Sequence, residues 1–242
     1  MSGKISSLVV LVAISFLVSC AQPEVEQAAE AVSDAVATVA ERPDPTVVDP
    51  DHYVAEFEND RVRIVRIKYG PGEESPMHYH PDHVGVFLTD LQAQVTMPDG
   101  STEELSVKAG EHEFAPAGQH RGKNLGGDFE IVAIELKSGA TGAVIEPDSV
   151  AVDPAHYTPE FENDQVRIVR IAYGAGEEST MHFHPDTVAV FLTDHLVQMT
   201  LPDGSKQDIS AQAGESLFIP AGQHLPKNIS DRAWELVLVE LK

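Results

Sequence analysis

The chain has 242 residues, which is enough for one large or two small domains. It carries 39 acidic against 16 basic side chains, a formal net charge of −23, and this surplus disfavours binding to nucleic acid and to anionic headgroups. The same surplus favours metal ions and other cations. The sequence holds a single cysteine, so no disulfide forms within the chain and a folded domain must be held by its apolar core.

The N-terminus is typical of a targeting segment. A lysine precedes the apolar run Ile5 to Val18, which is short for a membrane span of about 20 residues. The next residues, LVSC, resemble the lipobox of bacterial lipoproteins, in which the cysteine, here Cys20, is lipidated and begins the mature chain. An ordinary secretory signal cleaved near Ala21 is the alternative, which the bulky Leu17 disfavours. We expect a periplasm-facing lipoprotein of the bacterial cell envelope, in the outer rather than the inner membrane, that contacts the membrane only through this anchor.

Residues 21 to 48 form a polar stretch rich in alanine and glutamate. Its valines follow a spacing of three and four residues, which is compatible with a short amphipathic helix. A helix this short is marginal on its own, so a solvated tether between the lipid and the folded part is the favoured interpretation.

The rest of the chain is an internal duplication. The segment EFENDRVRIVRIKYGPGEES returns as EFENDQVRIVRIAYGAGEES, and VFLTD also occurs twice. Units of about 90 residues are too long for solenoid repeats and suit small domains. The sequence therefore predicts a signal over 1–20, a tether over 21–48, a first domain over 49–140, a linker over 141–152 and a second domain over 153–242.

Each unit carries strand signals and no sustained helical periodicity. The segment VRIVRI suggests alternation of apolar and cationic residues, and PDG at Pro98 to Gly100 suggests a hairpin turn. DFEIVAIELK and AWELVLVELK are typical of long terminal strands. Each unit is therefore predicted to be an all-β sandwich or barrel. The arginines of the alternating segments are expected on an outer face, paired with the surplus acids: Arg63, Arg66, Arg167 and Arg170.

Histidines recur at matching positions in the two units. In a strand, residues two apart point to the same face, so His78 and His80 project together, as do His182 and His184. A His-x-His pair is weak support for a metal site without a third ligand. Each unit offers one further along the chain, in the segments PAGQHRGKN and PAGQHLPKN, and these third histidines are His120 and His224.

The spacing of these residues resembles the two motifs of the cupin superfamily, and the whole chain resembles a bicupin. The first motif is Gly, five residues, His-x-His and then normally a Glu; the second is Gly-x5-Pro-x-Gly-x2-His-x3-Asn. The resemblance covers nearly all of residues 49 to 242 and implies two tandem double-stranded β-helix (cupin jelly-roll) barrels. Besides the histidines, the matching residues are Gly72, Gly110, Pro116, Gly118 and Asn124 in the first unit and Gly176, Gly214, Pro220, Gly222 and Asn228 in the second.

One departure from the family pattern bears on the chemistry. The Glu of the first motif would fall at Val84 or Gly85 and at Val188 or Ala189, so neither unit has it. The remaining three-His set resembles that of the three-His cupin dioxygenases. Three imidazoles suit a divalent transition metal (Fe, Zn, Mn, Cu or Ni), and the resemblance implies up to one ion per domain. Two alternatives stay open: Asp82 and Asp186 restore a carboxylate, or the histidines are structural and bind no metal.

Other shared side chains are candidates for contacts with a small-molecule ligand. Gln94 and Gln198 lie on a later strand and are expected to face the cavity, while Gln119 and Gln223 adjoin the third histidine and are expected to orient a substrate. His52 and His156 are expected to serve a turn or an inter-strand contact. The histidines without a counterpart in the other unit are interpreted as surface or incidental residues: His83, His112 and His195.

Two functions from different classes follow from these observations. The first is a metal-dependent enzyme, with a dioxygenase as the nearest family example, acting on a small molecule inside one or both barrels. The second is a non-catalytic lipoprotein that captures a metal or a small ligand. A metal-free structural bicupin is a third interpretation. Association into a homodimer is expected by resemblance alone, since cupins often associate through their outer strands.

Overall fold

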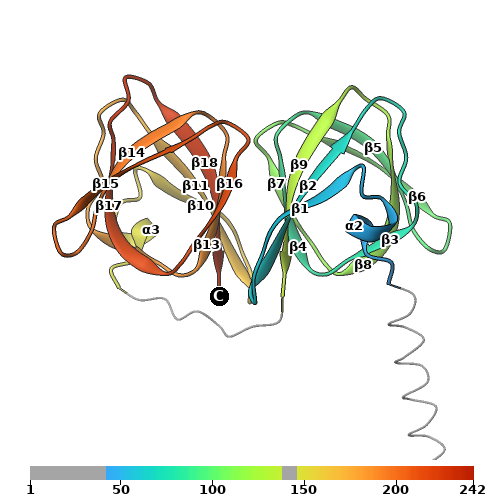
Figure 1. Cartoon of the computed structure of the whole chain (residues 1–242), viewed down its shortest axis with the longest axis horizontal. Coiled ribbons are helices and arrows are strands. Elements are labelled where there is room, and N and C mark those ends of the chain that lie inside the picture. The colour runs from blue at the N-terminus through green and yellow to red at the C-terminus, as the bar shows by residue number, and fades with distance from the viewer. Residues whose placement is uncertain (1–41, 138–145) are drawn as a thin grey trace, which may run out of the picture. The chain divides into compact units, whose positions relative to one another are not determined.

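The computed structural model describes residues 42–137 and 146–242 (Figure 1). The predicted signal, Cys20 and the greater part of the predicted tether lie outside the described residues. None of the helices within the described ranges has the length and apolar character needed to cross a membrane.

The first repeat forms a run of short strands, as its alternating segments predict. Its hairpin turn at Pro98 to Gly100 joins β5 and β6, with Gly100 at a φ of 84° that favours glycine. The strands are β1 (Tyr53–Glu58), β2 (Val62–Tyr69), β3 (His78–His80), β4 (His83–Phe87), β5 (Leu91–Thr96), β6 (Thr102–Val107), β7 (His112–Ala115), β8 (Gly118–Asn124) and β9 (Phe129–Leu136).

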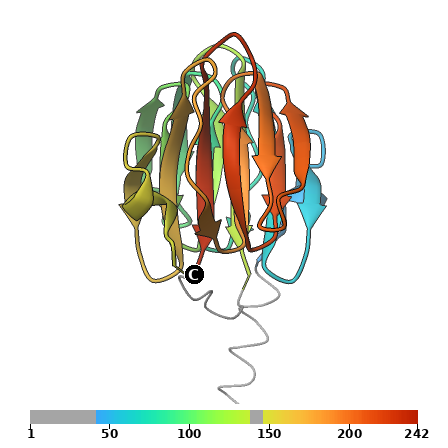
Figure 2. The same cartoon turned by 90° about the vertical axis from the view of Figure 1, so that its left-hand side faces the viewer.

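The second repeat folds in the same way, strand for strand. Figure 2 looks onto this half, whose later strands are coloured orange to red. The strands are β10 (Tyr157–Glu162), β11 (Val166–Tyr173), β12 (His182–His184), β13 (Thr187–Phe191), β14 (His195–Thr200), β15 (Lys206–Ala211), β16 (Ser216–Ile219), β17 (Gly222–Asn228) and β18 (Trp234–Leu241).

Each repeat closes two antiparallel sheets into a barrel. In the first barrel the sheets have the strand orders β1-β2-β9-β4-β7 and β3-β8-β5-β6; in the second they are β10-β11-β18-β13-β16 and β12-β17-β14-β15. Two facing sheets leave room for an enclosed interior between them, which is where side chains from several strands can converge. The prediction of an all-β fold with two tandem barrels is confirmed.

The five-stranded sheets are buried on both faces. Val65 and Ile67 of β2 pack inside the first barrel, whereas their neighbours Val62 and Ile64 belong to a core that also contains side chains of the second barrel, among them Val237. Alternate residues of one strand therefore serve two cores. This explains why the central strands of each barrel are apolar at almost every position rather than at every second one.

The expectation that the arginines pair with acids is confirmed, but the expectation that they lie on an outer face is wrong. Residues three apart on a strand point to opposite faces, so Arg63 lies on the inner side of β2 and Arg66 on the side of the second barrel. Arg63 bonds the buried Glu135 at 2.5 Å, and Arg66 donates to the carbonyl oxygen of Gly214 at 2.8 Å. The second barrel repeats the pattern, because Arg170 donates to the carbonyl oxygen of Gly110 at 2.8 Å.

Two short helices lie ahead of the barrels' first strands. Helix α2 (Pro45–Val48) begins after Asp44, whose side chain accepts from a backbone N–H of the first turn, and α3 (Ser149–Val152) begins after Asp148 in the same way. The two capping carboxylates also pair with Arg63 and Arg167. The last residues of the predicted tether and of the predicted linker are thereby attached to the barrels that follow them.

Candidate metal centres

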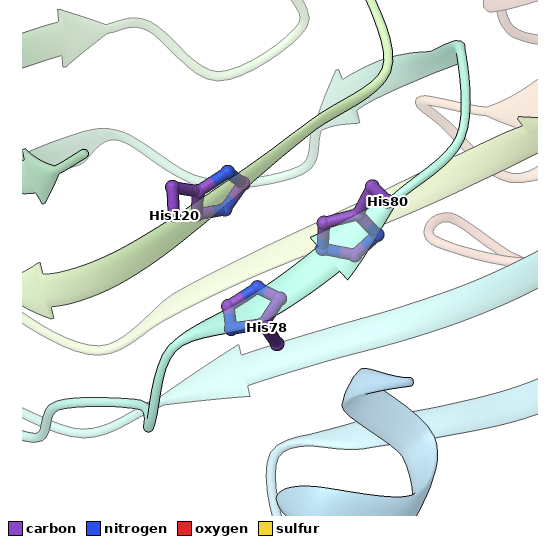
Figure 3. Close-up of side chains that lie close together, drawn as sticks. All are labelled: His78, His80 and His120. Atoms are coloured by element: carbon purple, nitrogen blue, oxygen red, sulfur yellow. The ribbon is translucent and has the colours of Figure 1, made fainter. Parts of the chain in front are cut away.

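The three histidines of the first barrel converge from two neighbouring strands. His78 and His80 lie on β3, and His78 is paired directly across the sheet with His120 of β8 (Figure 3). One ring nitrogen of each histidine lies within 4.8 Å of one ring nitrogen of the other two, an arrangement that could hold one metal ion. We refer to His78, His80 and His120 as the first trio.

The second barrel builds the same cluster from the equivalent strands. His182 and His184 lie on β12, and His182 is paired with His224 of β17. Their ligand nitrogens again lie within 4.8 Å of one another. These residues form the second trio, and the structure thus brings together both sets of histidines that the sequence spacing predicts.

Hydrogen bonds to Nδ1 orient two imidazoles of each trio. In the first trio, Nδ1 of His78 lies 2.9 Å from the carbonyl oxygen of Pro76 and Nδ1 of His80 lies 2.7 Å from a carboxylate oxygen of Glu135. Both partners are acceptors, so each Nδ1 carries the proton and Nε2 carries the lone pair, which in His78 accepts a hydrogen bond from the Tyr53 hydroxyl at 3.1 Å. This is the tautomer in which Nε2 can ligate a metal.

The second trio is held by equivalent contacts. Nδ1 of His182 lies 2.7 Å from the carbonyl oxygen of Thr180, and Nδ1 of His184 lies 2.6 Å from Glu240. Nε2 of His182 is buried and has no hydrogen-bond partner among the described residues. A buried nitrogen with a free lone pair is what a ligand atom requires, and it is costly if nothing occupies it.

The buried carboxylates of Glu135 and Glu240 are functional residues that the sequence reasoning missed. Each lies on the last strand of its barrel and bonds both a trio histidine and an arginine; Glu135 contacts Arg63, and Glu240 contacts Arg167. Burial opposes the ionisation of these acids, but the hydrogen bonds from histidine and arginine outweigh it and lower the pKa of both. The sequence did contain a signal for these two residues: each is a lone acid between apolar residues, in the IEL and VEL segments near the ends of the two repeats.

The trio histidines that do not bond a glutamate are neutral at physiological pH. Burial, with a smaller contribution from a neighbouring histidine, lowers the pKa of His182 to about 4. Burial acts in the same direction on His78, and it lowers the pKa of His120 and His224 to about 3. Neutral imidazoles are the form that binds metal ions, so no proton has to leave these side chains near pH 7.

No carboxylate joins either trio in the described part of the chain. Of the two positions where the cupin Glu would fall, Val84 points into the core between the barrels and Gly85 borders the first cavity. Asp82 does not replace it: its carboxylate accepts from the backbone N–H of Ala117 at 2.7 Å and from Gln165 at 2.8 Å. Asp186 likewise bonds a backbone N–H and an arginine of the other barrel. The alternative in which these aspartates complete the ligand set is wrong, because both are engaged in holding loops.

Each trio opens onto a cavity inside its barrel. The first cavity has a volume of ≈ 470 Å³ and the second one of ≈ 360 Å³, and both are lined by the second and third histidines of the trio. Cavities of this size suit small molecules. A ligand in either cavity would therefore lie beside the trio.

The four candidate glutamines divide into two pairs. Gln119 and Gln223 line the first and second cavities, and their contact with a substrate stays a prediction. Gln94 and Gln198 line neither of these two cavities. Their neighbours on β5 and β14 point inward instead, and the Gln198 side chain pairs with Asp208 on the outside of β15. The expectation that this pair faces the cavity is wrong, because strand parity places it on the outer face.

Two histidines interpreted as incidental lie inside the barrels, which corrects that interpretation. His83 lines the first cavity with its ring 5.0 Å from that of His80, and His195 lines the second cavity with its ring 4.2 Å from that of Trp234. Burial lowers the pKa of each to about 4. Their partners in the repeat are Thr187 and Leu91, so the sequence comparison showed only a difference.

The other histidines have structural contacts. His112 was also interpreted as incidental, but its Nε2 lies 2.8 Å from Glu160 of the second barrel and links the two halves. His52 bonds Asp49 at 2.7 Å, and His156 bonds Asp153. Both of the latter lie just before the first strand of a barrel, in agreement with the predicted turn role.

Comparison with known proteins shows the fold. No protein-family model matches the sequence, and no curated protein matches it either. Solved structures do. A cupin 2 conserved barrel domain protein from Leptotrichia buccalis is 11% identical, with a TM-score of 0.51 over 78% of this chain and 88% of that one.

Two further solved structures show the same likeness. AerE from Microcystis aeruginosa is 12% identical, with a TM-score of 0.56 over 79% of this chain and 97% of that one. The oxalate decarboxylase of Bacillus subtilis is 14% identical, with a TM-score of 0.54 over 78% of this chain and 71% of that one. One structure of that decarboxylase is described by its Mn(II) centres. At these identities the likeness concerns the fold: the chain is built from two cupin-type barrels in tandem.

Proposed function

We propose that the protein is a metal-binding bicupin of the bacterial cell envelope, with one divalent transition metal in each barrel, and that it is a metal-dependent enzyme acting on a small molecule. The observation that carries the proposal is the pair of trios, each with its ring nitrogens within 4.8 Å and its imidazoles oriented through Nδ1.

The donor set fits a borderline transition ion. Imidazole nitrogen suits Zn, Fe, Cu and Ni. Mn is also among the metals expected from the sequence, and a structural neighbour is described with Mn(II) centres. The trio supplies three neutral ligands, so an ion held there keeps its full positive charge. Such an ion would supply Lewis-acid chemistry or, if it is redox-active, dioxygen chemistry. The buried pairs of Glu135 with Arg63 and of Glu240 with Arg167 orient one ligand of each trio and raise its basicity.

The cavities favour an enzyme over a structural bicupin. Both open beside a trio, and neither is filled by side chains. Non-catalytic capture of a metal or small ligand is the second candidate, favoured by the formal charge of −23. Oxygen consumption or turnover with a panel of small chelating acids separates the two. Oxalate belongs in this panel because a structural neighbour is an oxalate decarboxylase.

Elemental analysis of the natively produced full chain tests the metal proposal. We expect up to two equivalents of transition metal. Replacing His78 and His120 by Ala should halve the content, and replacing His182 and His224 as well should abolish it. His112→Gln is the matched control, since this histidine lies outside both trios and should leave the content unchanged. Unchanged metal in the fourfold variant would show that the trios do not bind it.

The envelope location and the anchor at Cys20 form a separate part of the proposal. It is supported by the apolar run followed by LVSC. In a bacterial host the full chain should fractionate with the outer membrane, and Cys20→Ser should lose the membrane association. A homodimer is also proposed, and the concentration dependence of the mass in solution tests it.

A further inference from the structure

The walls of the two cavities differ although the trios beside them are the same. At five equivalent positions the side chain has changed in chemical character. The first barrel has His83, Leu91, Glu103, Glu113 and Phe129 where the second has Thr187, His195, Gln207, Leu217 and Trp234, and all ten line their cavities.

The second cavity has an aromatic inner wall. The rings of His195 and Trp234 lie 4.2 Å apart, and Phe191 lies 5.0 Å from His195. His195 and Trp234 are only 5% and 3% exposed, and the indole is stacked on Tyr173 at 4.5 Å, so a small part of each ring faces the cavity. Burial keeps His195 neutral near pH 7, so its ring adds a flat, uncharged surface. Rings of this kind bind planar molecules by stacking and by burial of apolar area.

The same wall holds two polar atoms without partners. Nδ1 of His195 and Nε1 of Trp234 are both buried and have no hydrogen-bond partner among the described residues. Buried polar groups are rarely left unpaired in native proteins. Nε1 has almost no accessible surface, so the indole must turn toward the cavity before a carbonyl or hydroxyl oxygen on a bound molecule can supply the partner that its N–H lacks.

The lining of the second cavity also lacks formal charge. No aspartate, glutamate, lysine or arginine is among its described lining residues, whereas Glu103, Glu113 and Lys123 line the first cavity. At the position of Glu113 the second barrel has Leu217, which is 44% exposed. An apolar side chain at the rim lowers the cost of transferring an uncharged molecule from water.

We propose that the second barrel binds a flat, uncharged aromatic molecule carrying a hydrogen-bond-accepting oxygen, and that the first barrel does not. The ring lies against the cavity-facing parts of Trp234 and His195, and the indole turns toward it so that its N–H donates to the oxygen. The proposal names the ligand class of one of the two sites in the proposed function. It rests on that function only for a ligand that also reaches the trio. Stacking on the wall requires no metal.

Tryptophan fluorescence tests this proposal, because Trp234 is the only tryptophan in the chain and therefore reports on the second cavity alone. Coumarin is a suitable probe, since it is planar, uncharged and carries a carbonyl oxygen. Titrating the full chain with coumarin should change the tryptophan emission saturably, with one site per chain by calorimetry. Succinate, which is charged and not aromatic, should leave the emission unchanged.

Exchange variants make the test specific to the wall. His195→Leu installs the residue that the first barrel has at this position and should weaken coumarin binding at least tenfold. His112→Leu, outside both cavities, should leave it unchanged. Trp234→Phe, followed by calorimetry, gives a second estimate if His195→Leu folds poorly. The proposal would be overturned if His195→Leu and Trp234→Phe both bound coumarin as tightly as the unaltered chain, or if the unaltered chain did not bind it.

Metal content measured on the same samples separates this proposal from the previous one. Coumarin binding in a chain that never holds metal would refute the metal proposal and support the aromatic wall. Metal in both barrels without coumarin binding would refute the aromatic wall alone.

Discussion

The two barrels have the same candidate metal ligands and differ in the walls of the cavities beside them. Both place a trio on two neighbouring strands, and both tie one of its histidines to a buried glutamate that is paired with an arginine. The cavity walls, in contrast, exchange acids for amide or apolar side chains and leucine for histidine.

This pattern separates two kinds of constraint within one chain. The trio and its glutamate need fixed distances, so any change of residue type would lose a ligand or leave a buried charge unpaired. The wall needs only to match the shape and polarity of whatever it contacts. The barrels thus have one proposed metal chemistry and two different environments for a ligand.

The largest expected effect comes from the buried carboxylates that the barrels share. Glu135→Gln removes the charge that orients His80 and leaves Asp44 as the acidic partner of Arg63 within the described residues. We expect a loss of about 3 kcal/mol in the free energy of unfolding and roughly 10- to 100-fold weaker metal binding in the first barrel.

Glu240→Gln should do the same in the second barrel only. Urea denaturation and metal titration of the two variants measure both effects. A variant that loses stability but keeps its metal affinity would assign the glutamate to folding alone.

The contacts between the barrels should be energetically equivalent. Arg66 and Arg170 each donate to a glycine carbonyl of the opposite barrel at 2.8 Å. Replacing either by Ala should lower the free energy of unfolding by about 2.5 kcal/mol, because a charge-assisted hydrogen bond is lost. Thermal or urea denaturation of the pair provides the measurement, and very unequal losses would contradict the equivalence.

His195 should make the second barrel sensitive to acid. Its pKa in the folded protein is about 4, below the ordinary value of 6.5, so between these pH values the unfolded chain binds a proton that the folded chain does not. Stability therefore falls as the pH drops through this window, by about 2 kcal/mol at pH 5 from this group. His195→Leu should lose less stability than the unaltered chain between pH 7 and pH 5, and an identical loss would argue against a neutral buried imidazole.

The smallest expected effect concerns His83, which lines only the first cavity. His83→Thr copies the second barrel at this position, and Thr187→His makes the reverse change. Both variants should keep their full metal content, with stability changes of about 1 kcal/mol or less. Loss of metal from the first barrel in His83→Thr would show that the trio there depends on a fourth imidazole.

Much of the fold could be predicted because the sequence states it twice. The repeat, the strand periodicity and the hairpin at Pro98 to Gly100 indicated tandem all-β barrels, and His78 with His80 fell on one face because strand side chains alternate. The third histidine was identified by its matching place in the two repeats, and the resemblance to the second cupin motif agreed with it. Direct pairing of His78 with His120 across β3 and β8 is what brings it to the others.

The misjudged residues have a common physical cause. The five-stranded sheet of each barrel is buried on both faces, so a polar residue in VRIVRI or IEL does not reveal which core it enters. Arg63 and Glu135 were missed as a pair because they meet only when β2 lies beside β9. Gln94 was predicted to face the cavity, but side chains alternate along a strand and its neighbours face inward instead. The cavity position of His195 was missed because nothing in the sequence shows that it packs against Trp234.

Anomalous diffraction from crystals of the metal-loaded full chain tests the central claim most directly. If the trios bind metal, each barrel should show one anomalous peak, about 2.0 to 2.3 Å from Nε2 of the three imidazoles of its own trio and with no carboxylate oxygen in contact. Peaks confined to surface carboxylates, with both trios empty at saturating metal, would contradict it.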